Sequence, residues 1–253
     1  MRFATPLMPG RLVRRYKRFF VDVALEDGTV VTAHCPNTGA LRGCLTEGSA
    51  AWLEPSNNPK RKLAYTWKMV RIGDAMIHVD AASGNRLAEE ALMENLIPEL
   101  GSFDRILREV TVDDSRLDLV LSSGGRKHTE GRRVRWTDDT RVFVEVKSTT
   151  MAEQKDSERQ ALFPDAITTR GQKHLRTLMD VVKRGDRAAM VYVIQRDDCQ
   201  GFAAAHEIDP DYANLLHAAI RMGVEAYALA ARVTPEGVEL HRRVPIRMGP
   251  HTS

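Results

Sequence analysis

Two segments of the sequence place charged side chains inside otherwise apolar, strand-like runs. In residues 141–147, valines occupy every second position, and Phe143, Glu145 and Lys147 occupy the positions between them. This period of two is typical of a β-strand with one apolar face. In residues 116–121, Asp118 interrupts three alternating leucines that should share one face. The two patterns predict neighbouring strands, one presenting Asp118 and the other presenting Glu145 and Lys147.

These residue types suit a site for a divalent metal. Mg²⁺ prefers hard oxygen ligands and commonly takes one or two protein carboxylates, which Asp118 and Glu145 could supply. Lys147 could orient or deprotonate an attacking water, or stabilise charge on phosphorus. Alternatively, Glu145 and Lys147 form an ordinary charge pair on a solvated strand face. Asp118 favours a site for Mg²⁺ (or Mn²⁺), because strands disfavour aspartate.

Composition limits the class of protein. The chain has 253 residues, 43% hydrophobic and 28% charged, which is typical of a soluble globular protein of one or two domains. The net charge of +3 is too small, taken alone, to indicate nucleic-acid binding. Three cysteines without a CxxC pattern predict free thiols in the cytoplasm. The sequence shows neither a signal peptide nor an apolar run long enough to cross a membrane.

Residues 1–82 are predicted to be all-β. Short apolar runs flank tight turns at Asp27-Gly28 and Gly73-Asp74, and the pattern indicates a small OB-like barrel. Two basic clusters accompany nearby aromatic residues: Arg11, Arg14, Arg15, Lys17 and Arg18, and then Lys60, Arg61 and Lys62. Such residues can bind phosphates and stack on bases. They are equally consistent with a solvated face above core aromatics.

From residue 83 the pattern becomes that of an α/β domain. A helix is expected to begin with Asn85 as its cap. Either Glu89, at the edge of the apolar stripe, or Glu90, which faces further away, could add a third carboxylate. Residues 122–140 are Gly-rich, polar and basic, and predict a long loop that could embrace a polyanion or be a surface insertion.

Further along the chain, residues 167–183 predict a helix whose first turns present Arg170, Lys173 and His174. Cations at a helix start oppose its dipole, which is more natural if they meet an anion such as phosphate. A surface histidine is the alternative for His174. Residues 188–196 predict a central strand buried on both faces. A helix at 210–222, strands at 224–233 and 238–244, and a flexible tail at 248–253 complete the prediction.

Several short motifs, in order along nearly the whole chain, resemble the sugar fermentation stimulation protein A (SfsA) family. The matching stretches are 2–3, 9–12, 34–39, 58–62, 85–87, 116–118, 145–147, 162–166 and 170–175. The resemblance implies an OB-like domain followed by a domain similar to the PD-(D/E)XK nucleases, and a DNA-binding protein linked to sugar (maltose) utilisation genes. Its nuclease-like motif falls on Asp118, Glu145 and Lys147, and the family pattern favours Glu90 over Glu89.

The resulting prediction is an α/β (α+β) fold with an OB-like β-barrel at 1–82 and a restriction-endonuclease-like domain at 83–247. One hypothesis is a Mg²⁺-dependent DNA phosphodiesterase with Asp118, Glu145 and Glu90 at the metal and Lys147 at the reacting phosphate. The other is a non-catalytic DNA-binding regulator, which would bind DNA without metal. A homodimer is left open. The predicted nucleic-acid contacts are Arg11, Arg14, Arg15, Lys17, Lys60, Arg61, Lys62, Arg170, Lys173 and His174.

Overall fold

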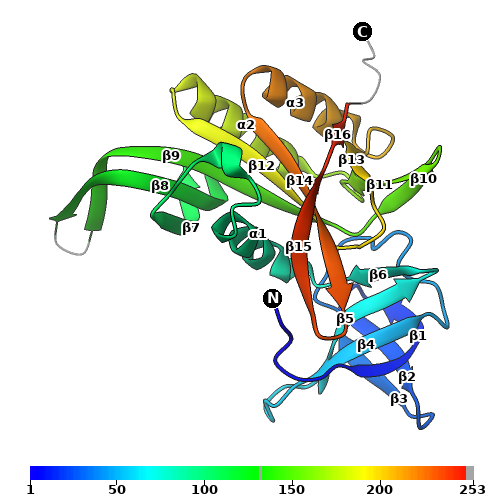
Figure 1. Cartoon of the computed structure of the whole chain (residues 1–253). Coiled ribbons are helices and arrows are strands. Elements are labelled where there is room, and N and C mark those ends of the chain that lie inside the picture. The colour runs from blue at the N-terminus through cyan, green and yellow to red at the C-terminus, as the bar shows by residue number, and fades with distance from the viewer. Residues whose placement is uncertain (131–132, 249–253) are drawn as a thin grey trace.

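The computed structural model describes residues 1–130 and 133–248, and within 126–139 it describes the backbone alone. The first part of the chain forms a β-barrel (Figure 1). Its strands are β1 (Met8–Tyr16), β2 (Phe20–Leu25), β3 (Val30–His34), β4 (Ala50–Pro55), β5 (Tyr65–Ile72) and β6 (Ala75–His78). The order is β3-β2-β1-β4-β5-β6, and pairing of His34 in β3 with Thr66 in β5 closes the barrel. The predicted OB-like barrel is confirmed.

Strand β1 is the barrel strand that the sequence analysis did not predict. Arginines occupy positions 11, 14 and 15, so the run lacks a clear apolar alternation. Leu12 alone in this strand is fully buried, and it packs with Val21, Leu53 and Trp67 in the barrel core. Backbone pairing with β2 and β4 instead positions β1 in the barrel.

The second part of the chain is a mixed sheet with helices on both faces, as predicted (Figure 1). The strand order is β15 (Gly237–Val244), β14 (Glu225–Thr234), β12 (Arg187–Ile194), β9 (Arg133–Thr149), β8 (Ser115–Glu130) and β7 (Arg105–Val112). Strands β9, β12 and β14 are parallel; β8 and β15 join them antiparallel, and β7 pairs antiparallel with β8. Helix α1 (Gly84–Met93) packs on one face, while α2 (Thr169–Lys183) and α3 (Pro210–Arg221) pack on the other.

Strand β12 is the centre of this sheet. It pairs in parallel with β9 on one side and β14 on the other, and its residues from Ala188 to Ile194 are buried. The nearly continuous apolar run at 188–196 therefore predicted the correct element, because a strand covered on both faces has no polar side.

The predicted loop at 122–140 is wrong, because the described part of it belongs to β8 and β9. Their antiparallel ladder continues from Leu119 and Val144 out to Glu130 and Arg133, and Figure 1 shows the paired strands projecting beyond the rest of the sheet. Gly124 and Gly125, whose residue type favours a loop, lie within β8 with φ of +72° and +79°. A projecting hairpin has no core to cover, so its sequence shows no apolar face.

A second, smaller sheet lies beside α3 and was missed by the sequence analysis. It consists of β10 (Ala152–Lys155), β11 (Glu158–Phe163), β13 (Gly201–Ala204) and β16 (Ile246–Arg247). Two short 3-10 helices, Ala81–Ser83 and Pro98–Leu100, flank helix α1. The predicted tail falls outside the described residues except for Met248.

Several backbone contacts attach the barrel to the second part of the chain, and two of them come from β6 and from the segment after β3. Strand β6 forms an antiparallel bridge between Ile77 and Arg196, and the His78 N–H donates to the Gln195 carbonyl at 2.9 Å. Separately, the Leu41 N–H donates to the Asp165 carboxylate at 3.2 Å. Cys35, Cys44 and Cys199 are buried, free thiols. No helix in the described ranges is long and apolar enough to cross a membrane.

Candidate functional site

Asp118 lies where the regular pairing of β8 is interrupted. The backbone ladder between β8 and β9 stops at Leu119 and Val144, and at the next position the Asp118 Oδ2 accepts a hydrogen bond from the Val146 N–H at 2.9 Å. On the other side of β8, the pair of Glu109 and Asp118 is skipped, and Glu109 has a φ of +57°. The Asp118 carboxylate therefore accepts from the Val146 N–H, a backbone donor that would bond a carbonyl in a regular ladder.

This interruption also corrects the prediction that three leucines share one face. Leu117 packs in the core cluster with helices α2 and α3, whereas Leu119 and Leu121 pack in the cluster with α1. The alternation changes sides at Asp118 because a strand that departs from the regular pleat no longer keeps its period of two.

Glu145 comes from the neighbouring strand β9 and is 1% exposed. Its Oε1 contacts both the Lys147 ammonium and the His174 Nδ1. Lys147 Nζ and His174 Nδ1 are themselves 3.5 Å apart. The structure thus brings together the predicted Glu145, Lys147 and His174, while the other oxygen of Glu145 points elsewhere.

Helix α2 delivers His174 because its first turn is fixed by a side-chain cap. The Thr168 hydroxyl accepts a hydrogen bond from the Gly171 N–H at 3.0 Å, which satisfies one of the free donors at the helix start. His174 is 4% exposed, and its Nε2 lies 3.5 Å from the Arg170 Nε. The helix start expected from the sequence is therefore correct to within two residues, and His174 faces the carboxylate rather than solvent.

Asn85, which the sequence analysis predicted to cap a helix, is instead a member of the site. Ser83 occupies the N-cap of α1, so Asn85 lies inside the first turn, and its Nδ2 donates to the Asp118 Oδ1 at 2.9 Å. The signal was the 85–87 motif, whose asparagine is equally suited to a helix cap. Helix α1 can approach β9 this closely because residue 84 is glycine: a Cβ there would lie 1.9 Å from the Ser148 Oγ.

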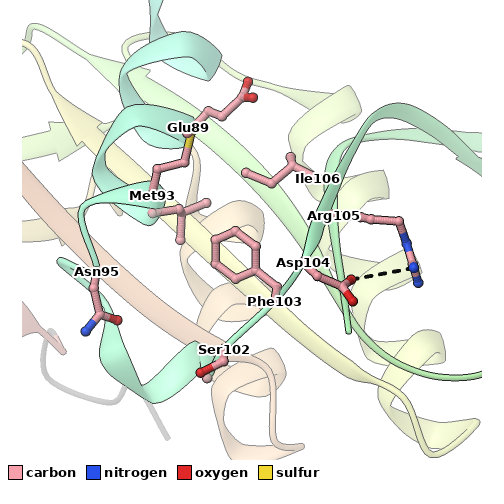
Figure 2. A pocket seen from close by; sticks show the side chains of 10 residues that line it. Glu89, Met93, Asn95, Ser102, Phe103, Asp104, Arg105 and Ile106 are labelled. Atoms are coloured by element: carbon pink, nitrogen blue, oxygen red, sulfur yellow. Dashed lines mark ion pairs between the residues drawn. The ribbon is translucent and has the colours of Figure 1, made fainter. Parts of the chain in front are cut away.

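The two candidate glutamates of α1 have other partners. Glu90 pairs with the Met1 amino group at 2.7 Å and with the Arg86 Nε at 2.9 Å. Glu89 pairs with Arg108, and it borders a cavity of about 610 Å³ beside Phe103 and Ile106 (Figure 2). A third carboxylate at the site, from Glu90 or Glu89, therefore stays a prediction.

The two carboxylates of the site differ in their electrostatic environment. Burial and the nearby negative charge of Glu145 raise the pKa of Asp118 above its ordinary value, although the Val146 N–H and Asn85 oppose this. Burial also acts to raise the pKa of Glu145, but the His174 hydrogen bond and the Lys147 charge outweigh it, so that pKa is lowered. The site thus holds Glu145 ionised, and the negative charge of Glu145 disfavours ionisation of Asp118.

The donors at this site fit a hard divalent cation. Glu145 Oε2 is buried and has no hydrogen-bond partner, which is costly for an ionised oxygen and would be relieved by a metal ligand bond. A cation between the carboxylates would also remove the repulsion that raises the pKa of Asp118. Across the described residues, no three His, Cys, Asp or Glu side chains are clustered closely enough for a metal. Mg²⁺ needs only one or two carboxylates, with water completing its shell.

The remaining predicted nucleic-acid contacts lie in two other places. Lys173 is held by the Asp114 carboxylate at 2.9 Å and the Asp114 carbonyl at 2.8 Å. The basic clusters lie on the barrel: Arg14 bonds Asp22 and covers the Tyr16 ring, whereas Arg15 bonds the carbonyls of Arg18 and Asn37.

Pairing of the strands brings the end of the first basic cluster, at Lys17 and Arg18, to the rim of the barrel that also borders the second cluster. Tyr16 pairs with Phe20, Phe20 with His34, and His34 with Thr66. Three strand spacings amount to roughly 15 Å. Arg61, from the second cluster, donates to the Thr66 hydroxyl at 3.0 Å. Clusters far apart in sequence therefore border one surface.

Comparison with known proteins agrees with this two-part architecture. Residues 13–79 match the SfsA N-terminal OB domain, and residues 82–237 match the sugar fermentation stimulation protein RE domain. The sugar fermentation stimulation protein homolog of Geobacter metallireducens is 47% identical, with 97% of this chain and 99% of the relative covered. The homolog of Geobacter sulfurreducens is 46% identical, with 96% and 97% covered.

A solved structure shares the whole fold. The structure of Pyrococcus furiosus SfsA in complex with Ca²⁺ superposes with a TM-score of 0.80 at 25% identity and covers 98% of each chain. The family models, the near full-length relatives and this fold agree on one assignment: the chain belongs to the sugar fermentation stimulation protein (SfsA) family.

Proposed function

We propose that the chain is a divalent-metal-dependent phosphodiesterase acting on DNA, with Asp118 and Glu145 as metal ligands. One observation carries the proposal: two carboxylates from neighbouring strands lie beside Lys147, and one buried oxygen, Glu145 Oε2, has no partner in the protein. The Ca²⁺ complex of the Pyrococcus furiosus relative supports it, because Ca²⁺ and Mg²⁺ both take oxygen ligands.

In this proposal each side chain has a distinct task. Bound Mg²⁺ or Mn²⁺ would stabilise negative charge on the phosphate and favour ionisation of a water. Lys147 and His174 occupy Glu145 Oε1 and leave Oε2 as the oxygen that would bind the metal. Asn85 orients Asp118 through its carboxylate hydrogen bond. Glu90, which has other partners here, would act through water.

Lys147 has two tasks that are compatible with its position. It holds Glu145 ionised, and its side chain is 15% exposed. A fixed cation in a largely dry site stabilises charge that develops on phosphorus more strongly than it would in water. The exposed Arg170, next to His174, is placed to meet a neighbouring phosphate, and Lys173 could do so by releasing Asp114.

Cleavage assays with a matched variant pair test this function. Purified protein would be incubated with single-stranded, duplex and branched DNA in Mg²⁺, Mn²⁺ or EDTA. The Glu145→Gln variant keeps the shape of the side chain but removes its charge, and we expect it to lose at least about 100-fold in rate. Glu94→Gln, at an exposed position after α1, is the control and should cleave normally. Equal cleavage by Glu145→Gln would exclude the proposed site.

A non-catalytic DNA-binding regulator of sugar metabolism genes is the second candidate function. The observation that favours it is the barrel rim, where exposed Lys17, Arg18 and Phe19 adjoin the stacked rings of Tyr16 and Phe20. Cations interspersed with aromatic rings suit phosphates and stacked bases. A protein of this kind would bind DNA equally well in EDTA and leave every substrate intact, so the same assay distinguishes the two functions.

A further inference from the structure

A second cavity lies away from the carboxylates. It has a volume of about 810 Å³ and lies between the small sheet, helix α3 and residues 42–43 of the barrel. None of Asn85, Asp118, Glu145, Lys147 or His174 lines it. Volumes of roughly 300–1,000 Å³, and positions between domains, are typical of small-molecule sites.

One wall of this cavity is apolar and made of small side chains. Ala203, Ala204 and Ala205 line it along and after β13, and Ala213 lines it from α3. Because alanine side chains project little from the backbone, this part of the wall is flat. Ala204 also packs against the core cluster that contains Ala161 and Phe202, so this wall adjoins the protein core.

A buried acceptor without a partner also lines the cavity. Gln160 is 6% exposed, and its Oε1 has no hydrogen-bond partner. An unpaired buried amide oxygen is unfavourable in a folded protein, and each such group requires an explanation. A ligand that donates an N–H or O–H to Gln160 would remove this cost.

The rim of the cavity favours an anion. Four cationic side chains line it against two carboxylates, Glu153 and Glu207; the cations are Arg42, Lys155, Arg221 and Arg247. Arg247 pairs with Glu158, whereas Arg221 and Lys155 are exposed. The cations come from the barrel, the small sheet and α3, and the Arg42 Nε donates to the Asp165 carbonyl at 3.1 Å.

We propose that this cavity binds a nucleoside monophosphate. The flat base would lie against the alanine wall, an amino group of the base would donate to Gln160 Oε1, and the phosphate would meet the cationic rim. The inference does not depend on the phosphodiesterase proposal, since it uses none of those residues. The shared chemistry allows a free mononucleotide or the terminal nucleotide of a strand as the source.

Binding would be measured by nuclear magnetic resonance on the ¹⁵N-labelled full chain in EDTA, with AMP, GMP, CMP and UMP as probes. We expect shifts in β11, β13 and α3, with affinity in the millimolar range or tighter. Competition by a 5′-phosphorylated oligonucleotide would identify a strand terminus as the source, and absence of competition would identify a free mononucleotide. No shift with any probe, or shifts confined to the barrel rim or the carboxylate site, would overturn the proposal.

Three variants sharpen this test. Ala203→Leu fills the cavity, Gln160→Met removes the acceptor and Arg221→Gln removes a rim cation; each should weaken binding about tenfold. Arg176→Gln, at an exposed position on α2, is the control and should bind as the parent does. Because the Gln160 acceptor is unpaired, Gln160→Met should unfold at the same or a higher temperature. Unchanged affinity in all three variants would contradict the site even if binding occurs.

Discussion

The Asn85 amide of helix α1 holds the Asp118 carboxylate, with Nδ2 2.9 Å from Oδ1. Val146 N–H binds the other oxygen at 2.9 Å, so both oxygens of Asp118 are fixed by donors from two different elements. Each oxygen keeps a further lone pair. Asp118 is therefore oriented by the protein and still able to bind a cation.

Removing the Asn85 amide should weaken metal binding without unfolding the chain. Groups that orient metal ligands typically contribute roughly 10–100-fold to affinity or activity, so we expect a decrease of this size for Asn85→Ala. Isothermal titration with Ca²⁺ or Mn²⁺ would measure it directly. Asn214→Ala, at an exposed position of α3, is the control. Unchanged metal affinity in Asn85→Ala would show that Asp118 needs no orientation from α1.

Neutralising Asp118 should abolish cleavage and change how the stability of the metal-free protein depends on pH. Because burial and the charge of Glu145 raise the folded-state pKa of Asp118 above its unfolded value, the ionised form destabilises the fold at neutral pH. This destabilisation disappears as the pH falls through the folded-state pKa. Asp118→Asn removes this titration but leaves either the Asn85 amide or the Val146 N–H without its acceptor, so we expect its Tm relative to that of the parent to be highest near pH 7 and to fall in acid. Asp113→Asn, at an exposed ion pair, should change Tm little.

A methyl group at position 84 should push helix α1 away from β9. Its Cβ would lie 1.9 Å from the Ser148 Oγ, and overpacking of this kind costs about 1–3 kcal/mol. Removing the hydroxyl should relieve part of the clash, so Gly84→Ala combined with Ser148→Ala should be more stable than Gly84→Ala alone. Urea unfolding of the parent, the two single variants and the double variant gives the coupling energy, and strictly additive effects would contradict the clash.

The joint between the barrel and the second part of the chain should weaken in mild acid. Burial lowers the pKa of His78 to about 4, below the value of about 6.5 in the unfolded chain. The unfolded state therefore binds the proton first, so stability is complete above about pH 6.5 and falls as the pH drops toward 4. The difference corresponds to about 3 kcal/mol.

Comparison with a variant isolates this contribution from the other titrating groups. The free energy of unfolding of the parent should fall between pH 7 and pH 4 by about 3 kcal/mol more than that of His78→Gln. His206→Gln, which changes an exposed histidine, should follow the parent. Parallel curves for parent and His78→Gln would mean that His78 is not held neutral in the folded chain.

If DNA crosses the barrel rim, its affinity should depend steeply on salt. Replacing Lys60, Arg61 and Lys62 with glutamine should reduce the slope of log affinity against log salt by roughly 0.9 for each phosphate that these cations neutralise in the parent. Fluorescence anisotropy in EDTA measures this without cleavage. Arg232→Gln, at an exposed ion pair of β14, is the control. An unchanged slope in the triple variant would place DNA elsewhere.

The sequence predicted those parts of the fold in which burial imposes a clear period. The buried run of β12 and the amphipathic helices α2 and α3 follow directly from their apolar spacing. Strand β1 was missed and the outer part of the β8–β9 hairpin was predicted as loop, because neither has a continuous apolar face. The small sheet was missed for the same reason: β10 is mostly exposed.

The candidate site was predictable from residue types, whereas the contacts among its members were not. Asp118, Glu145 and Lys147 were identified by charges that interrupt apolar strands. Their partners depend on which helix reaches which strand: His174 lies 29 residues from Glu145, and Asn85 lies 33 residues from Asp118. Helix periodicity separated Glu89 from Glu90 by their faces, but could not reveal that both would be bound to other charges.

Several contacts attach the barrel to the second part of the chain, among them Ile77 with Arg196 and Leu41 with Asp165, and together they restrict movement of the barrel. If a strand of nucleic acid bound to the barrel rim also reached Asp118 and Glu145, a fixed number of nucleotides would separate the segment bound at the rim from the segment at the carboxylates. The spacing between the binding surface and the cleavage site would be constant, and the cleavage products would show one dominant length rather than a ladder.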